Sequence, residues 1–352
     1  MDIQKNLTHK PNLFSFATSE LSQDAVLCYI FSWADDKYLE INKGLCETAK
    51  SLLSRFTRGR ISEKEIHKVE VGRQWKNIDI WVEINNDAFL VVEDKTSTTS
   101  HNNQLERYKE IAKNEYKGKL DKLSFAYFKT DNEPNSILRY IKSIDYEVIT
   151  RADVLEILRP CESCQIIADY VSYLEDIENK TQEYKTKPVD KWGWYQWQGF
   201  FKWLEDEAVI NVDSWGYVSN PSGGFLGLWW HFQQIDDNLQ MYLQFEQQKF
   251  CIKIEYSGED TDRSQIRDMW HNRLMEEAKR MGLQVEKPSF GKGMYMTIGV
   301  VEDIFMYDDH SINMNDPHQI NSLIEKLHQY ERLVDRCTDP TSTVGNWHDR
   351  QG

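Results

Sequence analysis

Hydrophobic side chains recur at helical spacing in two stretches of the first part of the chain. Residues 19–35 and 45–56 each place apolar residues three and four positions apart, which predicts helices with one buried face. Ser19 or Ser22 can cap the first helix, because a serine hydroxyl accepts a hydrogen bond from a backbone N–H of the first turn. The apolar faces consist of Leu27, Ile30, Phe31 and Ala34 in the first stretch and of Leu45, Ala49, Leu52 and Phe56 in the second.

The pattern then changes to the two-residue period of β-strands. Residues 65–71 and 78–84 are expected to form a strand hairpin, and in the second strand Asp79 lies on the face opposite to the isoleucines. An Asn-Asn-Asp turn is expected at 85–87. The unbroken apolar run 88–92 is typical of a central strand covered on both faces.

Further strands and helices are expected up to residue 180. They are a helix at 103–116, strands at 123–128 and 146–149, and helices at 154–158 and 166–174. Helices before and after a meander of strands predict an α/β sandwich that fills most of residues 12–180.

The second half of the chain differs in character. Residues 181–190 are polar, contain Pro188 and lack periodicity, so we expect a linker there. Nine of the twelve tryptophans follow it. We expect an α+β domain over 191–336 and a flexible tail over 337–352. The expected elements are strands at 225–232, 241–246, 250–256 and 294–300 and helices at 263–281 and 318–332.

Composition restricts the class of protein. Hydrophobic residues make up 40% of the 352 residues, no stretch reaches the roughly 18 apolar residues of a membrane helix, and the first residues lack an apolar signal core. We therefore expect a cytoplasmic protein with no membrane contact. Of the six cysteines, Cys161 and Cys164 form one CxxC pair, but no second pair is near enough to predict a zinc site.

The formal net charge of −15 argues against tight, non-specific DNA binding, which depends on many lysine and arginine contacts to phosphate. Residues 1–120 nevertheless contain equal numbers of acidic and basic side chains, so the whole excess falls after residue 120. The first part of the chain is not repulsive to nucleic acid, and a bound cation would help it to meet phosphate.

The candidate chemistry is concentrated at one end of the predicted sheet, in the second and third predicted strands. Asp79 lies in one strand and Glu93 ends the next, so the hairpin can bring the two carboxylates together. Glu93 and Lys95 are two positions apart and point to the same face. Mg²⁺ takes one or two carboxylates together with water and substrate phosphate, and the backbone carbonyl of Asp94 would lie between them as a further ligand. Lys95 can orient the attacking water and offset charge on the phosphate oxygens.

This set, Asp79 followed by Glu93-Asp94-Lys95 at the end of an apolar strand, resembles the PD-(D/E)XK nuclease superfamily, and in particular a bacterial branch with an N-terminal "ELS" helix. Gln104 and Tyr108 resemble its QxxxY element, and Glu20 resembles its early helix acid. Ile78 stands in the place of the motif's proline. The resemblance covers about residues 12–180.

The resemblance implies a restriction-endonuclease-like core, with a mixed sheet flanked by helices, and phosphodiester hydrolysis with Mg²⁺ or Mn²⁺. DNA is the expected substrate, and defence against phage or DNA processing is the expected setting by analogy. It assigns catalysis to Asp79, Glu93, Lys95, Gln104 and Glu20. Among positions near the site, Arg73 and Lys76, in the loop expected before Asp79, and Tyr108 are candidates for substrate binding.

Structural explanations stand beside these assignments. The carboxylates could be surface charges paired with Lys95, Glu20 could only favour a helix N-terminus, and Gln104 with Tyr108 could be a packed pair one helical turn apart. His101, a lone histidine in a loop, is typically solvated. The tryptophans could stack bases, but core packing is the commoner role of large aromatics.

Three functions therefore remain open from the sequence: a DNA nuclease, an RNA nuclease, and a catalytically silent binding module that kept the nuclease fold. The acidic second half favours a protein partner or a ligand over a long DNA duplex. A homodimer is compatible with the sequence. We expect residues 188–336 to select the target and the first half to perform the chemistry.

Overall fold

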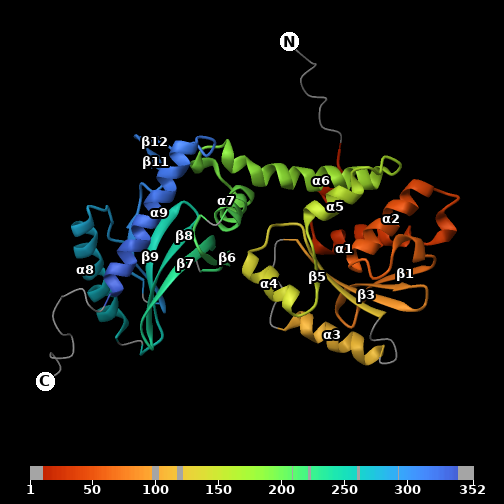
Figure 1. Ribbon diagram of the computed structural model, residues 1–352, viewed down its shortest axis with the longest axis horizontal. Helices are drawn as coiled ribbons and strands as arrows, with labels where there is room; N and C mark the ends of the chain where they lie inside the picture. The colour runs from red at the N-terminus through yellow and green to blue at the C-terminus, as the bar shows by residue number, and fades with distance from the viewer. Residues whose placement is uncertain are drawn as a thin grey trace, which may run out of the picture. The chain divides into compact units, whose positions relative to one another are not determined.

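The computed structural model describes residues 11–96, 103–116, 122–207, 209–220, 223–259, 262–291 and 293–339 (Figure 1). The chain forms two compact units, which divide between Lys180 and Thr181. No helix within the described ranges is both long enough and apolar enough to span a membrane.

The first unit is an α/β fold built on a five-stranded mixed sheet, as the sequence predicts. The strands lie in the order β1-β2-β3-β4-β5, with β1, β2 and β3 antiparallel and β3, β4 and β5 parallel. The strands are β1 (Val69–Trp75), β2 (Ile78–Ile84), β3 (Ala88–Lys95), β4 (Leu123–Lys129) and β5 (Glu147–Ile149). The helices are α1 (Glu20–Ser32), α2 (Lys43–Phe56), α3 (Gln104–Glu115), α4 (Asn135–Ser143), α5 (Arg151–Leu158) and α6 (Gln165–Gln182).

Helices cover both faces of this sheet (Figure 1). One apolar core joins α1, α2, α5 and α6 to the sheet, and a second joins α3 and α4 to the other face. In β2 buried and half-buried residues alternate, whereas all eight residues of β3 are buried. A strand covered on both faces needs apolar side chains on both, which explains the unbroken apolar run that leads to Glu93.

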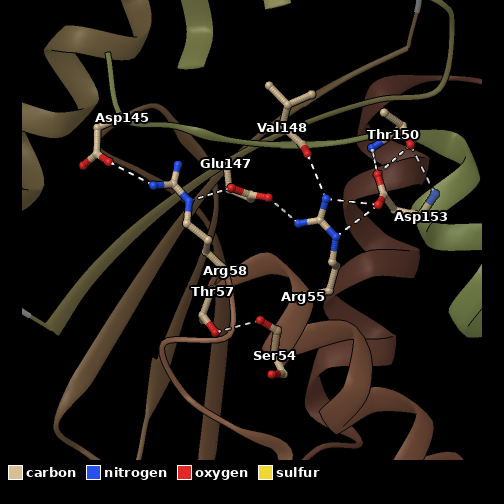
Figure 2. Close-up of polar contacts among 9 residues, drawn as sticks. All are labelled: Ser54, Arg55, Thr57, Arg58, Asp145, Glu147, Val148, Thr150 and Asp153. Carbon is tan, nitrogen blue, oxygen red and sulfur yellow. Dashed lines mark hydrogen bonds and ion pairs between the residues drawn. The ribbon is translucent and has the colours of Figure 1, made fainter. Parts of the chain in front are cut away.

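An ion-pair cluster ties the end of α2 to β5 and α5 (Figure 2). Arg55 lies 2.5 Å from Glu147 and 3.0 Å from Asp153, and Arg58 lies 2.6 Å from Glu147 and 3.3 Å from Asp145. Asp153 also accepts hydrogen bonds from the backbone N–H and the hydroxyl of Thr150, which closes a capping box at the start of α5. The cluster fixes these elements relative to one another.

The second unit is an α+β fold, again as the sequence predicts. Its antiparallel sheet has the order β10-β9-β8-β7-β6, and one apolar core packs α7, α8 and α9 against it. The strands of this sheet are β6 (Val212–Val218), β7 (Phe225–Asp236), β8 (Leu239–Glu246), β9 (Lys249–Tyr256) and β10 (Tyr295–Val301), and a separate pair is formed by β11 (Met306–Tyr307) and β12 (His310–Ser311). The helices are α7 (Trp194–Asp206), α8 (Arg263–Met281) and α9 (Pro317–Thr338).

Several boundaries differ from the sequence-based expectation. The first strand is β1, residues 69–75 and not 65–71, because Lys76 and Asn77 adopt positive φ and make a tight turn beyond it. Residues 181–190 are not an unstructured linker: α6 continues to Gln182, two short 3₁₀ helices follow, and Tyr184 and Val189 join the core of the second unit.

The end of the chain also differs. Helix α9 runs to Thr338, and Cys337, expected in the flexible tail, is fully buried in the core of the second unit. Residues 340–352 lie outside the described residues. Helices α4 and α7 and strand β6 were not expected from the sequence.

Candidate active site

Strand pairing brings the predicted carboxylates to one place. Ile80 of β2 faces Val92 of β3, so Asp79 and Glu93 are the next residues along the two antiparallel strands. The backbone N–H of Asp94 donates a hydrogen bond to Asp79 Oδ2 at 3.3 Å, which fixes the Asp79 carboxylate against the end of β3. The expected juxtaposition of these residues is therefore present.

Three oxygen atoms converge on the ammonium group of Lys95. Its Nζ lies 2.5 Å from Glu93 Oε1, 3.6 Å from Asp79 Oδ2 and 3.3 Å from the backbone carbonyl oxygen of Asp94. The Glu93 side chain is fully buried, and the side chains of Lys95 and Asp79 are 9% and 19% exposed. The group is thus not a set of solvated surface charges, the structural alternative that the sequence left open.

Burial and mutual charge determine how these groups titrate. Burial, reinforced by the negative charge of Asp79, raises the pKa of Glu93 to about 8. Burial acts to lower the pKa of Lys95, but the Glu93 carboxylate and then Asp79 raise it above its ordinary value. Lys95 is therefore an ammonium ion at neutral pH, and Glu93 keeps its negative charge there only beside a sufficient cation.

Helix α1 contributes polar groups to the same place. Glu20, its first residue, accepts a hydrogen bond from the backbone N–H of Thr96 through Oε1 at 3.4 Å. Gln23, one turn later, donates its amide both to Asp94 Oδ1 and to the backbone carbonyl of Lys95, the latter at 3.2 Å. Gln23 thereby holds the backbone that carries Asp94 and Lys95.

Asp24 of α1 and Asp94 of β3 form a second buried acidic pair. Burial, together with the charge of Asp79, raises the pKa of Asp24 to about 6, and burial raises that of Asp94 as well. Gln23 and Asp24 are not among the site residues that the sequence predicts. The signal was their spacing, because residues three and four positions after Glu20 share its face of the helix.

Gln104 and Tyr108 are one turn apart on α3 and hydrogen-bond to each other, with Gln104 Nε2 donating to the Tyr108 hydroxyl at 2.9 Å. The Tyr108 ring is 2% exposed and belongs to the core beneath α3, whereas Gln104 is half-buried. As placed, Tyr108 supports Gln104 and presents no open surface to a substrate.

The candidate substrate contacts lie around the first hairpin. Arg73 is in β1 and not in the expected loop, and its guanidinium donates to the backbone carbonyl of Leu21 on α1 at 3.1 Å. Lys76 is in the turn, where its ammonium lies 2.7 Å from Glu115 at the end of α3. His101 lies outside the described residues.

The donor set, made of oxygen atoms alone, fits Mg²⁺ or Mn²⁺ better than Zn²⁺. No three His, Cys, Asp or Glu side chains gather as a metal cage in the ranges that the structure describes. Two carboxylates and a carbonyl oxygen already face a single cationic nitrogen, and this set of hard oxygen ligands suits Mg²⁺ or Mn²⁺. Cys161 and Cys164 are both free thiols.

The two carboxylates and the lysine thus meet at one edge of a mixed sheet, on two adjacent strands. A comparison with protein-family models matches residues 11–215 to the PD-(D/E)XK nuclease superfamily. The match covers more than half of the chain, and the chain therefore belongs to this superfamily. Searches of the curated proteins and of the solved structures returned no match.

The matched region extends beyond the 12–180 expected from the sequence. It includes the end of α6, all of α7 and the first residues of β6, which belong to the second unit. The family pattern therefore does not end at the boundary between the two units.

Proposed function

We propose that the protein is a Mg²⁺- or Mn²⁺-dependent deoxyribonuclease whose active site is formed by Asp79, Glu93 and Lys95. The observation that carries this proposal is the convergence of Asp79 Oδ2, Glu93 Oε1 and the Asp94 carbonyl oxygen on Lys95 Nζ. Oxygen atoms that already surround one cation need little rearrangement to hold another.

Asp79, Glu93 and the Asp94 carbonyl would hold the metal ion. When bound, a divalent cation polarises the scissile phosphodiester and lowers the pKa of a coordinated water. The two carboxylates and the buried position of Glu93 supply the negative charge and the low-dielectric surroundings that favour a divalent ion. The same burial makes Glu93 unsuited to staying ionised without a cation.

Lys95 would act as a hydrogen-bond donor and a positive charge, and not as a proton acceptor. Its pKa is raised by Glu93 and Asp79, so the amine keeps its proton at neutral pH. An ammonium at this position can orient the attacking water and offset the charge that develops on the phosphate oxygens.

The surrounding residues would orient the substrate. Glu20 would add negative charge beside Lys95, and Gln104, supported by Tyr108, would donate a hydrogen bond from the start of α3. Arg73 and Lys76 would contact the nucleic-acid backbone from the first hairpin. Cleavage of foreign DNA, as in defence against phage, or DNA processing is the role that we propose for this activity.

Incubation of the purified protein with DNA or RNA, with and without Mg²⁺ or Mn²⁺, tests the function. We expect metal-dependent cleavage of DNA. Lys95→Ala should lower the cleavage rate by on the order of 10²-fold or more while the metal still binds, because removal of one charge-stabilising donor has that effect. Asp79→Asn should weaken Mn²⁺ binding in calorimetry.

Exposed residues provide matched controls. Lys43→Ala and Asp87→Asn change a lysine and an aspartate that are 75% and 53% exposed, and both proteins should cleave as the wild type does. Equal Mn²⁺ affinity in wild type and Asp79→Asn would refute the metal assignment. Cleavage of RNA alone would make the protein an RNA nuclease, and metal binding without any cleavage would identify a silent binding module.

A further inference from the structure

The sheet of the second unit has two chemically different faces. Helices α7, α8 and α9 pack on one face, where the indole N–H of Trp230 donates to Glu331 of α9 at 2.9 Å. The opposite face contains a pocket of about 360 Å³, and Trp229, the preceding residue of β7, lines it. The two tryptophans thus point to opposite faces, as neighbours in a strand do.

A β-bulge brings a second aromatic side chain to the pocket. Trp230 pairs with Leu243 and Gln233 with Met241, so two residues of β7 lie opposite the single residue Tyr242 of β8. His231, the extra residue, has a φ of 58°, which is unusual for a residue other than glycine. Bulges of this kind redirect side chains and are frequent near functional sites.

The consequence of the bulge is visible in the side-chain contacts. His231 turns toward α9, where its Nε2 lies 2.8 Å from Asp335 Oδ1. Phe232 consequently emerges on the pocket face and stacks on Tyr242, with 4.6 Å between ring centroids and 13° between planes. Trp229 and this stacked pair supply flat aromatic surfaces to the pocket, all of them from β7 and β8.

Polar groups complete the lining. Gln244 and Lys253 lie on neighbouring strands, and both are more than nine-tenths buried. Lys253 Nζ lies 2.9 Å from Glu246 Oε1, and Gln244 Nε2 donates to the same oxygen at 3.1 Å. Glu255 lies next to Lys253 on the lining. The positive charge of Lys253 is therefore already balanced by Glu246, with Glu255 adding negative charge.

We propose that this pocket binds a nucleobase, either free or unpaired within a strand. Aromatic surfaces that stack on a planar ring, together with donors and acceptors that meet its polar edge, are the features that recognise a base. An excess of positive charge, which phosphate recognition requires, is absent from the named lining residues. The choice of a base rests on the proposed function, because a nuclease substrate supplies that ligand.

The experiment measures binding to the full-length protein in EDTA, where no metal-dependent cleavage occurs. Adenosine, guanosine, cytidine and thymidine, a short single-stranded DNA, the corresponding duplex and deoxyribose 5-phosphate are titrated in turn, with tryptophan fluorescence and calorimetry as readouts. We expect saturable binding of at least one nucleoside, or of the single strand if the base must belong to a chain. Deoxyribose 5-phosphate, which lacks a base, should not bind.

Two variants test the location. Trp229→Ala removes a stacking surface, and Tyr295→Ala alters a residue of the rim that is 59% exposed, so its loss should leave the fold intact. Each should weaken binding, Trp229→Ala by on the order of tenfold, the usual size of a base–aromatic stacking effect. Tyr140→Ala, at a 43% exposed tyrosine of the first unit, is the matched control and should bind as the wild type does.

The outcomes separate this proposal from the proposed nuclease function. The pocket assignment is overturned if neither the nucleosides nor the single strand bind, if deoxyribose 5-phosphate binds equally well, or if the folded Trp229→Ala and Tyr295→Ala proteins retain wild-type affinity. Base binding that these variants abolish, in a protein that cleaves no nucleic acid with metal, would support the pocket and refute the nuclease function.

Discussion

The charges of Glu93 and Lys95 stabilise each other. A carboxylate that is fully buried is costly to ionise unless a cation lies beside it, and Lys95 provides that cation at 2.5 Å. A metal ion at the same oxygens would take over this compensation and leave the ammonium available to the substrate. The lysine is thus both a catalytic candidate and a partial compensation for the buried carboxylate, whose pKa stays raised to about 8 beside it.

The proposed role of Gln104 can be tested by substitution. Its amide donates a hydrogen bond to the Tyr108 hydroxyl, which holds it in place. If Gln104 contacts the substrate phosphate, Gln104→Ala should slow cleavage by about tenfold, the effect of losing a hydrogen bond to a charged group. The melting temperature should change little, because Gln104 is only half-buried. Cleavage rates and thermal melting, measured on the same preparations, check both expectations.

Tyr108→Phe serves as the companion variant, since it removes only the hydroxyl that accepts the Gln104 hydrogen bond. A smaller loss of rate is expected for it. A lowered melting temperature with unchanged activity of the folded fraction, in Gln104→Ala, would instead assign the pair to packing alone.

The residues that the sequence reveals are those joined by local geometry. Asp79, Glu93 and Lys95 lie in one hairpin, so the two-residue period and a short turn suffice to predict their meeting. Gln23 approaches Asp94 from a helix far away in the sequence, and that contact depends on how α1 packs on the sheet. Single-sequence patterns contain no information on such packing, which explains why Gln23 and Asp24 were missed.

At the scale of the element, Asp153 connects helix capping to the ion-pair cluster of Figure 2. Burial acts to raise its pKa, but hydrogen bonds from Thr150 and the charge of Arg55 outweigh burial and lower it. Asp153→Ala should therefore destabilise the first unit by about 1–2 kcal/mol at neutral pH, the usual range for a lost cap with a charged partner. Urea denaturation measures this difference.

The sign of the pH dependence follows from the lowered pKa. Asp153 stabilises the folded protein above the ordinary aspartate pKa of 3.8, and its contribution is lost as the pH falls below that value toward the folded-state pKa. The difference between wild type and Asp153→Ala should shrink over the same range. Asp176→Ala, at a 57% exposed aspartate of α6, is the control, and an equal loss of stability there would contradict the assignment.

The first strand shows why element boundaries were harder to predict than element types. Its sequence alternates weakly, so the prediction placed it at 65–71, whereas the strand is fixed by its partner: Val69 pairs with Ile84 and Trp75 with Ile78. The turn that sets this register uses positive φ at Lys76 and Asn77. Of these two residues, only the asparagine is a residue type that is common in such a turn.

For the whole molecule, the boundary at Lys180 suggests where the chain can be divided. The first unit has its own cores and the whole candidate active site, so a fragment that ends at Lys180 should unfold cooperatively and bind Mn²⁺ as we expect of the full chain. A fragment that ends at residue 186 should be less soluble, because Tyr184 belongs to the core of the second unit, which that fragment lacks. Gel filtration, thermal melting and calorimetry compare the fragments.

The family match extends to residue 215, which suggests an alternative: the nuclease fold could need part of the second unit. If the fragment ending at Lys180 aggregates or melts without cooperativity, whereas one that ends after residue 215 folds, then α7 is part of the nuclease fold. We propose that the second unit selects the target, and cleavage by the shorter fragment with wild-type rate and substrate preference would argue against that role.

The bulge in β7 also has a consequence for how this sequence tolerates changes in length. His231 is the surplus residue: without it, Phe232 would still lie opposite Tyr242 and Gln233 opposite Met241. A deletion at this position would preserve the order of side chains on both faces, although it would remove the contact with Asp335. A deletion between Phe225 and Trp230 would shift the preceding residues by one position and exchange core and pocket residues. Among related chains, position 231 is therefore a place where a gap in the strand would do little harm to the two faces.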